Sequence, residues 1–324
     1  MRRRHLVLGF AAAVLADCPA FGEARVWPDK LVRWVLSQPA GSGADSVARL
    51  LSERLQKSWG QPIVIENRVG GQNTIGALTA AHAPADGYTF YFATTAALIT
   101  NPLLFKQLPY DPQKDFVPVA FVGRSPFAIL VEATSPVKTI GDMIAHSKAK
   151  DGSFSLGNEG PRTFSGMIAR LFNARTGAQA NLVPYASVSV GVQDLIGGHV
   201  EAMVADVASV APHVTHGRLR MLATTSSARI AGWEQVPSLS ETLTGFDMVG
   251  WFAVVAPTGT PGAAIDRFNR DLNELLAHQE LAQRIAAIGP LVEAGWSTVQ
   301  VANFFRSESA RWTQLTREIG VLPE

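Results

Sequence analysis

The sequence predicts an α/β protein of two domains, with a cleft for a ligand between them. From Trp27 onward, short apolar runs typical of strands alternate with amphipathic stretches typical of helices. The chain has 324 residues, 47% of them hydrophobic, which is enough for one or two cores. Connections of crossover length favour parallel strands covered by helices. Two such units, joined by apolar crossing segments, leave a cleft where a small ligand can bind.

The first unit begins with the apolar run LVRWVLS at residues 31–37, which predicts a strand. A helix is expected next, from about Asp45 to Trp59, because one of its faces is apolar at helical spacing. That face consists of Val47, Leu50, Leu51, Leu55 and Trp59. The unit continues with a strand in QPIVIEN, a helix in TIGALTAAHA and a strand in YTFYFATT.

The second unit follows the run DFVPVAFVG and repeats the same alternation. We expect a strand in FAILVEA, a helix in TIGDMIAHSKAK, a strand in SFSLGN and a helix in TFSGMIARLFNARTG. This last helix carries Phe164, Ile168, Leu171 and Phe172 on one side. The pattern continues through ANLVPYA, VGVQDLIGGHV, EAMVADV and LRMLATTS, and returns through MVGWFAVVAPTGTP to two long helices.

Residues 1–24 have the pattern of a signal peptide. Three arginines follow Met1, the apolar run LVLGFAAAVLA comes next, and Gly22-Glu23-Ala24 fits a small-x-small cleavage site. We therefore expect an exported, periplasmic protein cut near Ala24, with an uncleaved N-terminal anchor as the alternative. Cys18 is the only cysteine and lies in this segment, so the mature chain is expected to contain no disulfide.

The charge balance excludes some classes of partner. The chain has 28 basic and 27 acidic residues, and cleavage removes three arginines and two acids to leave 25 of each. A balanced chain without basic runs is not typical of proteins that bind nucleic acid or anionic membranes. We therefore expect no nucleic-acid partner.

A glycine-rich loop, SQPAGSGADS at residues 37–46, joins the first strand to the first helix. It resembles the dinucleotide motif G-x-G-x-x-G, but Ser46 replaces the third glycine. Backbone N–H groups and the positive end of a helix can bind a carboxylate as well as a phosphate. We interpret Asp45 as the helix N-cap, the alternative being a contact with an ammonium or hydroxyl group of a ligand.

A second loop, GNEGPRTFSG at residues 157–166, precedes a helix of the second unit. Thr163 can cap that helix or donate its hydroxyl hydrogen. Arg162 can form a bidentate clamp on a carboxylate, or lie in solvent. We expect two helix N-termini, one from each unit, to face each other across the cleft and to bind an anionic group.

The sequence shows no arrangement typical of catalysis or metal binding. Its seven histidines are scattered without the spacing of metal ligands, and no G-x-S-x-G motif is present. We therefore expect no catalytic residue, no metal and no cofactor. A periplasmic enzyme acting on a small acid or ester is the alternative, because catalytic triads assemble from distant residues.

Several motifs, in this order, resemble those of the periplasmic solute receptors of tripartite tricarboxylate transporters, also called Bug proteins. They include WPDK, PAGSGADSVARLL, GQPIVIENRVGG, APADGYTF, LPYDPQKDFVPV and VPYASVSVGVQDLIGGHVEAM. The resemblance runs from about Trp27 to Glu324. It implies the two-domain type II periplasmic-binding fold, with domain 1 formed by residues 25–126 and 249–324 and domain 2 by residues 127–248. It also implies a small organic carboxylate as ligand and membrane permease subunits as partners, and we expect a monomer.

The resemblance places the ligand between the loops at residues 38–45 and 158–165. Gln38 stands where an aromatic residue is usual in the family and Ser42 replaces a glycine, so an atypical pocket is expected. Thr94, Tyr185 and Asp206 match pocket positions of the family more loosely. The expected ligand-binding residues are Gln38, Ala40, Gly41, Ser42, Gly43, Ala44, Asp45, Thr94, Asn158, Gly160, Pro161, Arg162, Thr163, Tyr185, Ser187 and Asp206.

Overall fold

Three parallel strands and the helices between them form the first lobe in the computed structural model, which describes residues 26–150 and 152–323. The elements are β1 (Val32–Leu36), α1 (Gly43–Trp59), β2 (Ile63–Asn67), α2 (Thr74–Ala81) and β3 (Thr89–Thr94). Strand β1 lies in the middle, so that Trp34 is opposite Ile65 of β2 and Phe90 of β3. The expected signal peptide lies outside the described residues.

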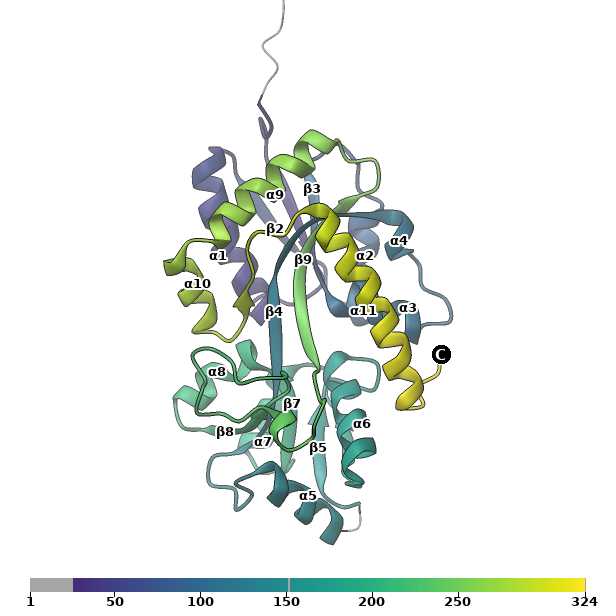
Figure 1. Ribbon diagram of the computed structural model, residues 1–324, viewed down its shortest axis with the longest axis vertical. Coiled ribbons are helices and arrows are strands. Elements are labelled where there is room, and N and C mark those ends of the chain that lie inside the picture. Colours follow the sequence, from purple (N-terminus) through teal and green to yellow (C-terminus); the bar gives the residue numbers. More distant parts are fainter. Residues whose placement is uncertain (1–25, 151, 324) are drawn as a thin grey trace, which may run out of the picture.

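One long strand belongs to both lobes. The strands that meet there are β4 (Phe116–Glu132), β7 (Ala202–Asp206) and β9 (Val249–Pro257). The first part of β4 pairs antiparallel with β9, as far as Pro126 opposite Val249. From Phe127, which lies opposite Asp206, β4 pairs antiparallel with β7 instead. Because β9 also pairs with β3, the strand order β2-β1-β3-β9-β4-β7 runs through both lobes (Figure 1).

The second lobe repeats the parallel arrangement of the first. Its further strands are β5 (Ser155–Asn158), β6 (Asn181–Pro184) and β8 (Leu219–Thr224). Strand β5 lies between β6 and β7 and runs parallel to both, while β8 lies antiparallel beside β4. The helices of this lobe are α5 (Ile140–Ala149), α6 (Phe164–Thr176), α7 (Val188–Ile196) and α8 (Val207–Thr215).

The C-terminal segment returns to the first lobe and reaches back to the second. It contains α9 (Gly262–Leu276), α10 (Gln279–Ala286), β10 (Leu291–Val292) and α11 (Thr298–Glu318). Helix α11 contacts α6 at two points. The ring of Trp312 lies 5.1 Å from that of Phe164, and Arg175 donates to both carboxylate oxygens of Glu318 at 2.9 and 3.1 Å. Short helical elements are η1 (Gly71–Asn73), η2 (Ala96–Thr100), α3 (Asn101–Leu104), α4 (Pro112–Asp115) and η3 (Leu239–Glu241).

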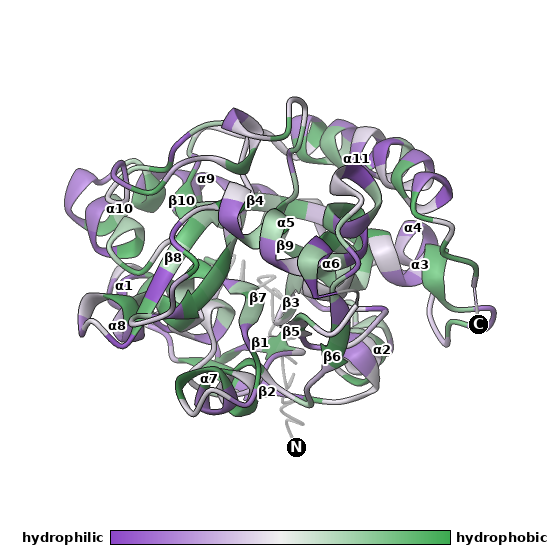
Figure 2. Ribbon diagram, turned by 90° about the horizontal axis from the view of Figure 1, so that it is seen from below, coloured by the Kyte–Doolittle hydropathy of each residue, from purple (hydrophilic) through white to green (hydrophobic). Residues whose placement is uncertain are grey.

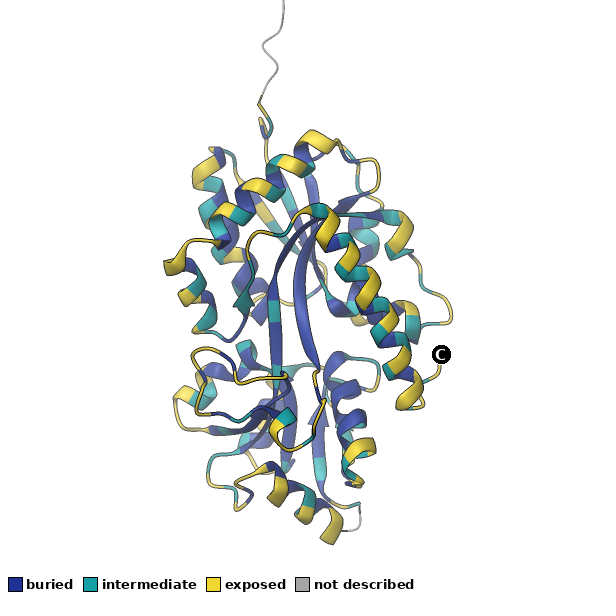
Figure 3. Ribbon diagram, viewed as in Figure 1, coloured by how far each residue is buried: buried dark blue, intermediate teal, exposed yellow. Residues whose placement is uncertain are grey.

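An aromatic cluster around Phe268 of α9 fills the core of the first lobe. The ring of Phe268 lies 4.4 Å from Phe90, 5.3 Å from Trp59 and 5.5 Å from Trp34, and its side chain is fully buried. Figure 3 shows that the central strands β4 and β9 are largely buried, while the outward faces of α9 and α11 are exposed. The hydropathy in Figure 2 follows the same division, because hydrophobic residues gather on the strands.

The sequence predicted the alternation of strands and helices but not the mixed sheet. Strands β1, β2 and β3 are parallel as expected, and so are β5, β6 and β7. In contrast, β4 pairs antiparallel with β7, β8, β9 and β10, and β9 pairs antiparallel with β3. The predicted parallel strands are therefore present in each lobe, but the strands that cross between the lobes run antiparallel to their neighbours, which the sequence did not predict. Helices α8 and α10 were not predicted. None of the helices in the described part of the chain is long and apolar enough to cross a membrane.

We predict that Phe268→Ala lowers the free energy of unfolding by about 3–5 kcal/mol, because it leaves a cavity among three packed aromatic rings. Urea unfolding followed by tryptophan fluorescence measures the change. Val299→Ala is the control, since Val299 is 67% exposed and should contribute little. Equal stability of the two variants would contradict the role given to Phe268.

Candidate functional site

The carboxyl ends of the parallel strands lie at one edge of the sheet in each lobe, where ligands of open α/β sheets usually bind. The first edge carries the loop after β1, and the second carries the loop after β5 and the end of β7. The two edges meet where α1 begins. A Cβ atom on Gly43 would lie 2.5 Å from Cβ of Ala208 and 2.8 Å from Oδ1 of Asp206. The first loop therefore lies against the second lobe.

Ser42 caps helix α1, and Asp45 lies inside its first turn. The Ser42 hydroxyl oxygen accepts from the N–H of Asp45 at 3.3 Å. The Asp45 carboxylate accepts from the N–H of Gly41 at 2.9 Å, from Arg49 at 2.8 and 3.0 Å, and from Asn67 at 2.9 Å. The prediction of Asp45 as the N-cap was wrong, because the helix begins two residues before it. Both of its oxygens are bonded to groups of its own lobe.

Gln38, at the start of the first loop, is also hydrogen-bonded within the first lobe. Gln38 donates its amide hydrogens to Asn73 at 3.0 Å and to Thr94 at 3.4 Å, while its Oε1 is buried without a hydrogen-bond partner. Ala40 and Gly41 form the exposed tip of the loop. Gly41 has φ +81°, a conformation that favours glycine, and space is open where its Cβ would lie.

The second loop forms a tight turn on the start of α6. The N–H of Gly160 donates to the side chain of Asn158 at 2.8 Å, and the Thr163 hydroxyl donates to the Gly160 carbonyl at 2.8 Å. Thr163 also accepts from the N–H of Gly166 at 3.2 Å and is the N-cap of α6. The Asn158 side chain therefore holds the loop in shape, as does Thr163.

Two backbone N–H groups at the start of α1, and two at the start of α6, remain available. They belong to Gly43 and Ala44 in the first lobe and to Phe164 and Ser165 in the second. No described residue accepts a hydrogen from them, as is usual at the first positions of a helix. All four residues are buried. Such N–H groups, together with the positive end of the helix, attract an anion.

Arg162 and Pro161 lie beside this turn. The Arg162 guanidinium lies over the ring of Phe105, which follows α3 of the first lobe, at 5.3 Å from the ring centre. Arg162 thus contacts both lobes, and Pro161 is exposed next to it.

Two further predicted residues lie beside α7 of the second lobe. The ring of Tyr185 packs close to Gly157 and Gly191, and its hydroxyl is directed to Asp194 of α7. Ser187 is the N-cap of α7 and accepts from the N–H of Val190 at 3.4 Å. Both side chains thus stabilise the region around α7.

Glu159 is the residue of this region that the sequence analysis did not single out. It follows β5 directly, and its half-buried carboxyl is close enough to Asp206 for the two charges to repel. Burial raises the pKa of Glu159 to about 7, with the charge of Asp206 adding to the effect. Asp206 caps α8 by accepting from the N–H of Ser209 at 2.9 Å, and burial raises its pKa as well. Glu159 stands out only once the ends of β5 and β7 are seen to lie side by side, which brings it close to Asp206.

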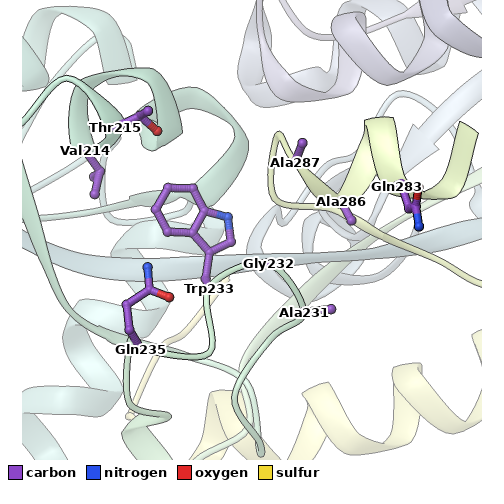
Figure 4. A pocket seen from close by; sticks show the side chains of 9 residues that line it. All are labelled: Val214, Thr215, Ala231, Gly232, Trp233, Gln235, Gln283, Ala286 and Ala287. Atoms are coloured by element: carbon purple, nitrogen blue, oxygen red, sulfur yellow. The ribbon is translucent and has the colours of Figure 1, made fainter. Parts of the chain in front are cut away.

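A separate recess of about 650 Å³ opens between the second lobe and α10. Its wall is formed by Trp233 together with Val214 and Thr215 on one side and by Gln283 and Ala286 of α10 on the other (Figure 4). The wall contains no charged residue and none of the predicted ligand-binding residues. Within residues 26–150 and 152–323, no group of His, Cys, Asp and Glu side chains is arranged to hold a metal ion.

Comparison with known proteins identifies the family. The model of the tripartite tricarboxylate transporter family receptor matches residues 47–321. The chain belongs to this receptor family. A UPF0065 protein of Bordetella bronchiseptica is 35% identical, over 99% of this chain and 97% of its own length.

Solved structures of similar proteins carry dicarboxylates. An R. palustris protein with adipate has a TM-score of 0.88 and 29% identity, covering 92% of this chain and all of its own. MatC from Rhodopseudomonas palustris, with bound malate, has a TM-score of 0.80 and 27% identity, covering 89% of this chain and 99% of its own. The two-domain α/β fold predicted for the receptor family is confirmed. The matching family is one of transporter receptors.

We predict that Asp45→Asn lowers the free energy of unfolding at pH 7 by about 1–3 kcal/mol, because it removes the charge that binds Arg49. Burial tends to raise the pKa of Asp45, but the hydrogen bonds from Arg49, Gly41 and Asn67 outweigh it and hold the pKa below 3.8. The stability provided by this carboxylate is therefore complete above pH 3.8 and is lost as the pH falls through the lowered pKa.

Urea unfolding of wild type and variant between pH 7 and pH 3 measures this dependence. The exposed Asp266 provides the control, Asp266→Asn, which should match wild type throughout. A difference between wild type and Asp45→Asn that grows on acidification would contradict the ion pair.

Proposed function

We propose that the protein is an extracytoplasmic solute receptor that binds a small organic carboxylate between its lobes and delivers it to a permease of the tripartite tricarboxylate type. The observation that carries this proposal is a helix N-terminus in each lobe, at the carboxyl edge of its sheet, whose first N–H groups have no acceptor among the described residues. Family membership and the dicarboxylates in two structural neighbours support it.

The proposed binding mode uses the backbone. The N–H groups of Gly43 and Ala44 would donate to carboxylate oxygens from the first lobe, and those of Phe164 and Ser165 from the second. Neutral donors of this kind bind an anion without an opposite full charge, because each helix end carries about half a positive charge. Gln38 and Thr94, which are bonded to each other, would contact the rest of the ligand from the first lobe.

We further propose that the domains divide where the sheet pairing of β4 changes, with residues 25–126 and 249–324 in one and residues 127–248 in the other. The change from β9 to β7 between Pro126 and Phe127 supports these boundaries. Bending there would open and close the two edges, and a ligand that binds both edges would favour the closed state. The closed surface would then be recognised by the permease, with the receptor acting as a periplasmic monomer without catalysis.

We predict that Gly43→Ala weakens carboxylate binding at least tenfold. The added methyl group would collide with Ala208 and Asp206, and so hold the two lobes apart. A thermal-shift screen with dicarboxylates, followed by calorimetric titration of the compounds that bind, measures the effect. A ligand present at one hundred times its dissociation constant stabilises the protein by about 2.7 kcal/mol.

Gly262→Ala is the matched control, because Gly262 is also the first residue of a helix and has open space at its Cβ position. Recovery of each compound unchanged after incubation separates a receptor from an enzyme. Equal affinity in wild type and Gly43→Ala would contradict binding between the lobes, and turnover would contradict a receptor.

A further inference from the structure

Glu159 and Asp206 bring two acidic side chains to the place where the ligand is expected. Glu159 follows β5 and Asp206 ends β7, which are neighbouring parallel strands, so both lie at the same edge of the second lobe. Asp206 also lies next to Gly43 of the first lobe, whose N–H is one of the unpartnered donors. Both acidic residues are half-buried. The acidic pair thus adjoins the helix ends assigned to the carboxylate.

Three other carboxylates among the described residues are more deeply buried, and each has an arginine partner. Asp45 is 2% exposed and binds Arg49 at 2.8 Å, and Glu308 is 6% exposed and binds Arg311 at 2.7 Å. A third, Asp271, is 9% exposed and lies against Arg267 at 2.5 Å. The protein therefore follows the general rule that a charge removed from water is paired.

Glu159 and Asp206 differ from these three carboxylates, because neither has an arginine partner in the described part of the chain. Glu159 accepts one long hydrogen bond, from the Ser165 hydroxyl at 3.4 Å, and Asp206 accepts from the N–H of Ser209. Among the described residues, no lysine, arginine or histidine forms an ion pair with either carboxyl. The raised pKa of both groups reflects this lack of compensation. Within residues 26–150 and 152–323, no side chain supplies a full positive charge to either carboxyl.

We infer that the ligand supplies this charge: it carries a cationic nitrogen as well as a carboxylate, and Glu159 with Asp206 binds that nitrogen. The inference rests on the proposed function and narrows its ligand from carboxylates in general to amino acids and related zwitterions. A ligand with anionic groups at both ends would instead bring further negative charge to two carboxyls that already repel each other. Charged hydrogen bonds in a partly buried site are strong enough to decide between such ligands.

The test compares compounds that differ only in the nitrogen: 6-aminohexanoate with hexanoate, and glutamate with glutarate. Calorimetric titration at pH 7.5 of the purified full chain gives the dissociation constants. We expect wild type to bind the amino compound of at least one pair about tenfold or more tightly than its partner. Glu159→Gln keeps the shape of the side chain and should abolish that preference, mainly by weakening the amino compound.

Two further variants keep the test decisive. Asp206→Asn retains a residue that can cap α8 and should also reduce the preference. Glu274→Gln, on the exposed face of α9, should leave it unchanged. If wild type binds the compounds without nitrogen as tightly, or if Glu159→Gln and Asp206→Asn both keep the preference, the inference is wrong while the carboxylate receptor stands. If none of the four compounds nor any dicarboxylate binds, the proposed function itself fails.

Discussion

The pairing of a single strand with two sheets is the constraint on which the rest of the structure depends. Strand β4 leaves β9 and joins β7 between Pro126 and Phe127, so the two lobes share one continuous backbone ladder. The sheet of each lobe therefore stays hydrogen-bonded while the carboxyl ends of its strands lie toward the other lobe. The close approach of Gly43 to Asp206 is a direct consequence, since these residues begin or precede helices at the two edges.

The groups available to a ligand at these edges depend on which polar side chains are already hydrogen-bonded within the protein. Ser42 and Thr163 cap their own helices, and Asp45 is held by Arg49, so each of these polar side chains already has a hydrogen-bond partner in the protein. In the proposed binding mode, the backbone N–H groups would bind an anion, and Glu159 with Asp206 would bind a cation. Such a receptor would recognise its ligand by the position of both charges, and Glu159 would set its specificity.

Local sequence patterns predicted many of the helices and strands, whereas the arrangement of side chains in the candidate site depends on contacts between residues far apart in the sequence. The apolar faces of α1 and α6 and the cap at Thr163 could be predicted because they depend on spacing within one helix. Asp45 was misassigned because aspartate and serine are both favoured at the cap, and local preference cannot choose between neighbours. Glu159 could not be singled out from local patterns, because its position beside Asp206 depends on the packing of β5 against β7.

The central claim is that backbone amides at two facing helix ends bind the ligand, and nuclear magnetic resonance of the ¹⁵N-labelled protein tests it most directly. On titration with the tightest-binding small acid, the amide signals of Gly43, Ala44, Phe164 and Ser165 should shift together and saturate at one dissociation constant. If these four signals stay in place while those around Trp233 shift, the ligand binds in the recess beside α10 and the account is wrong.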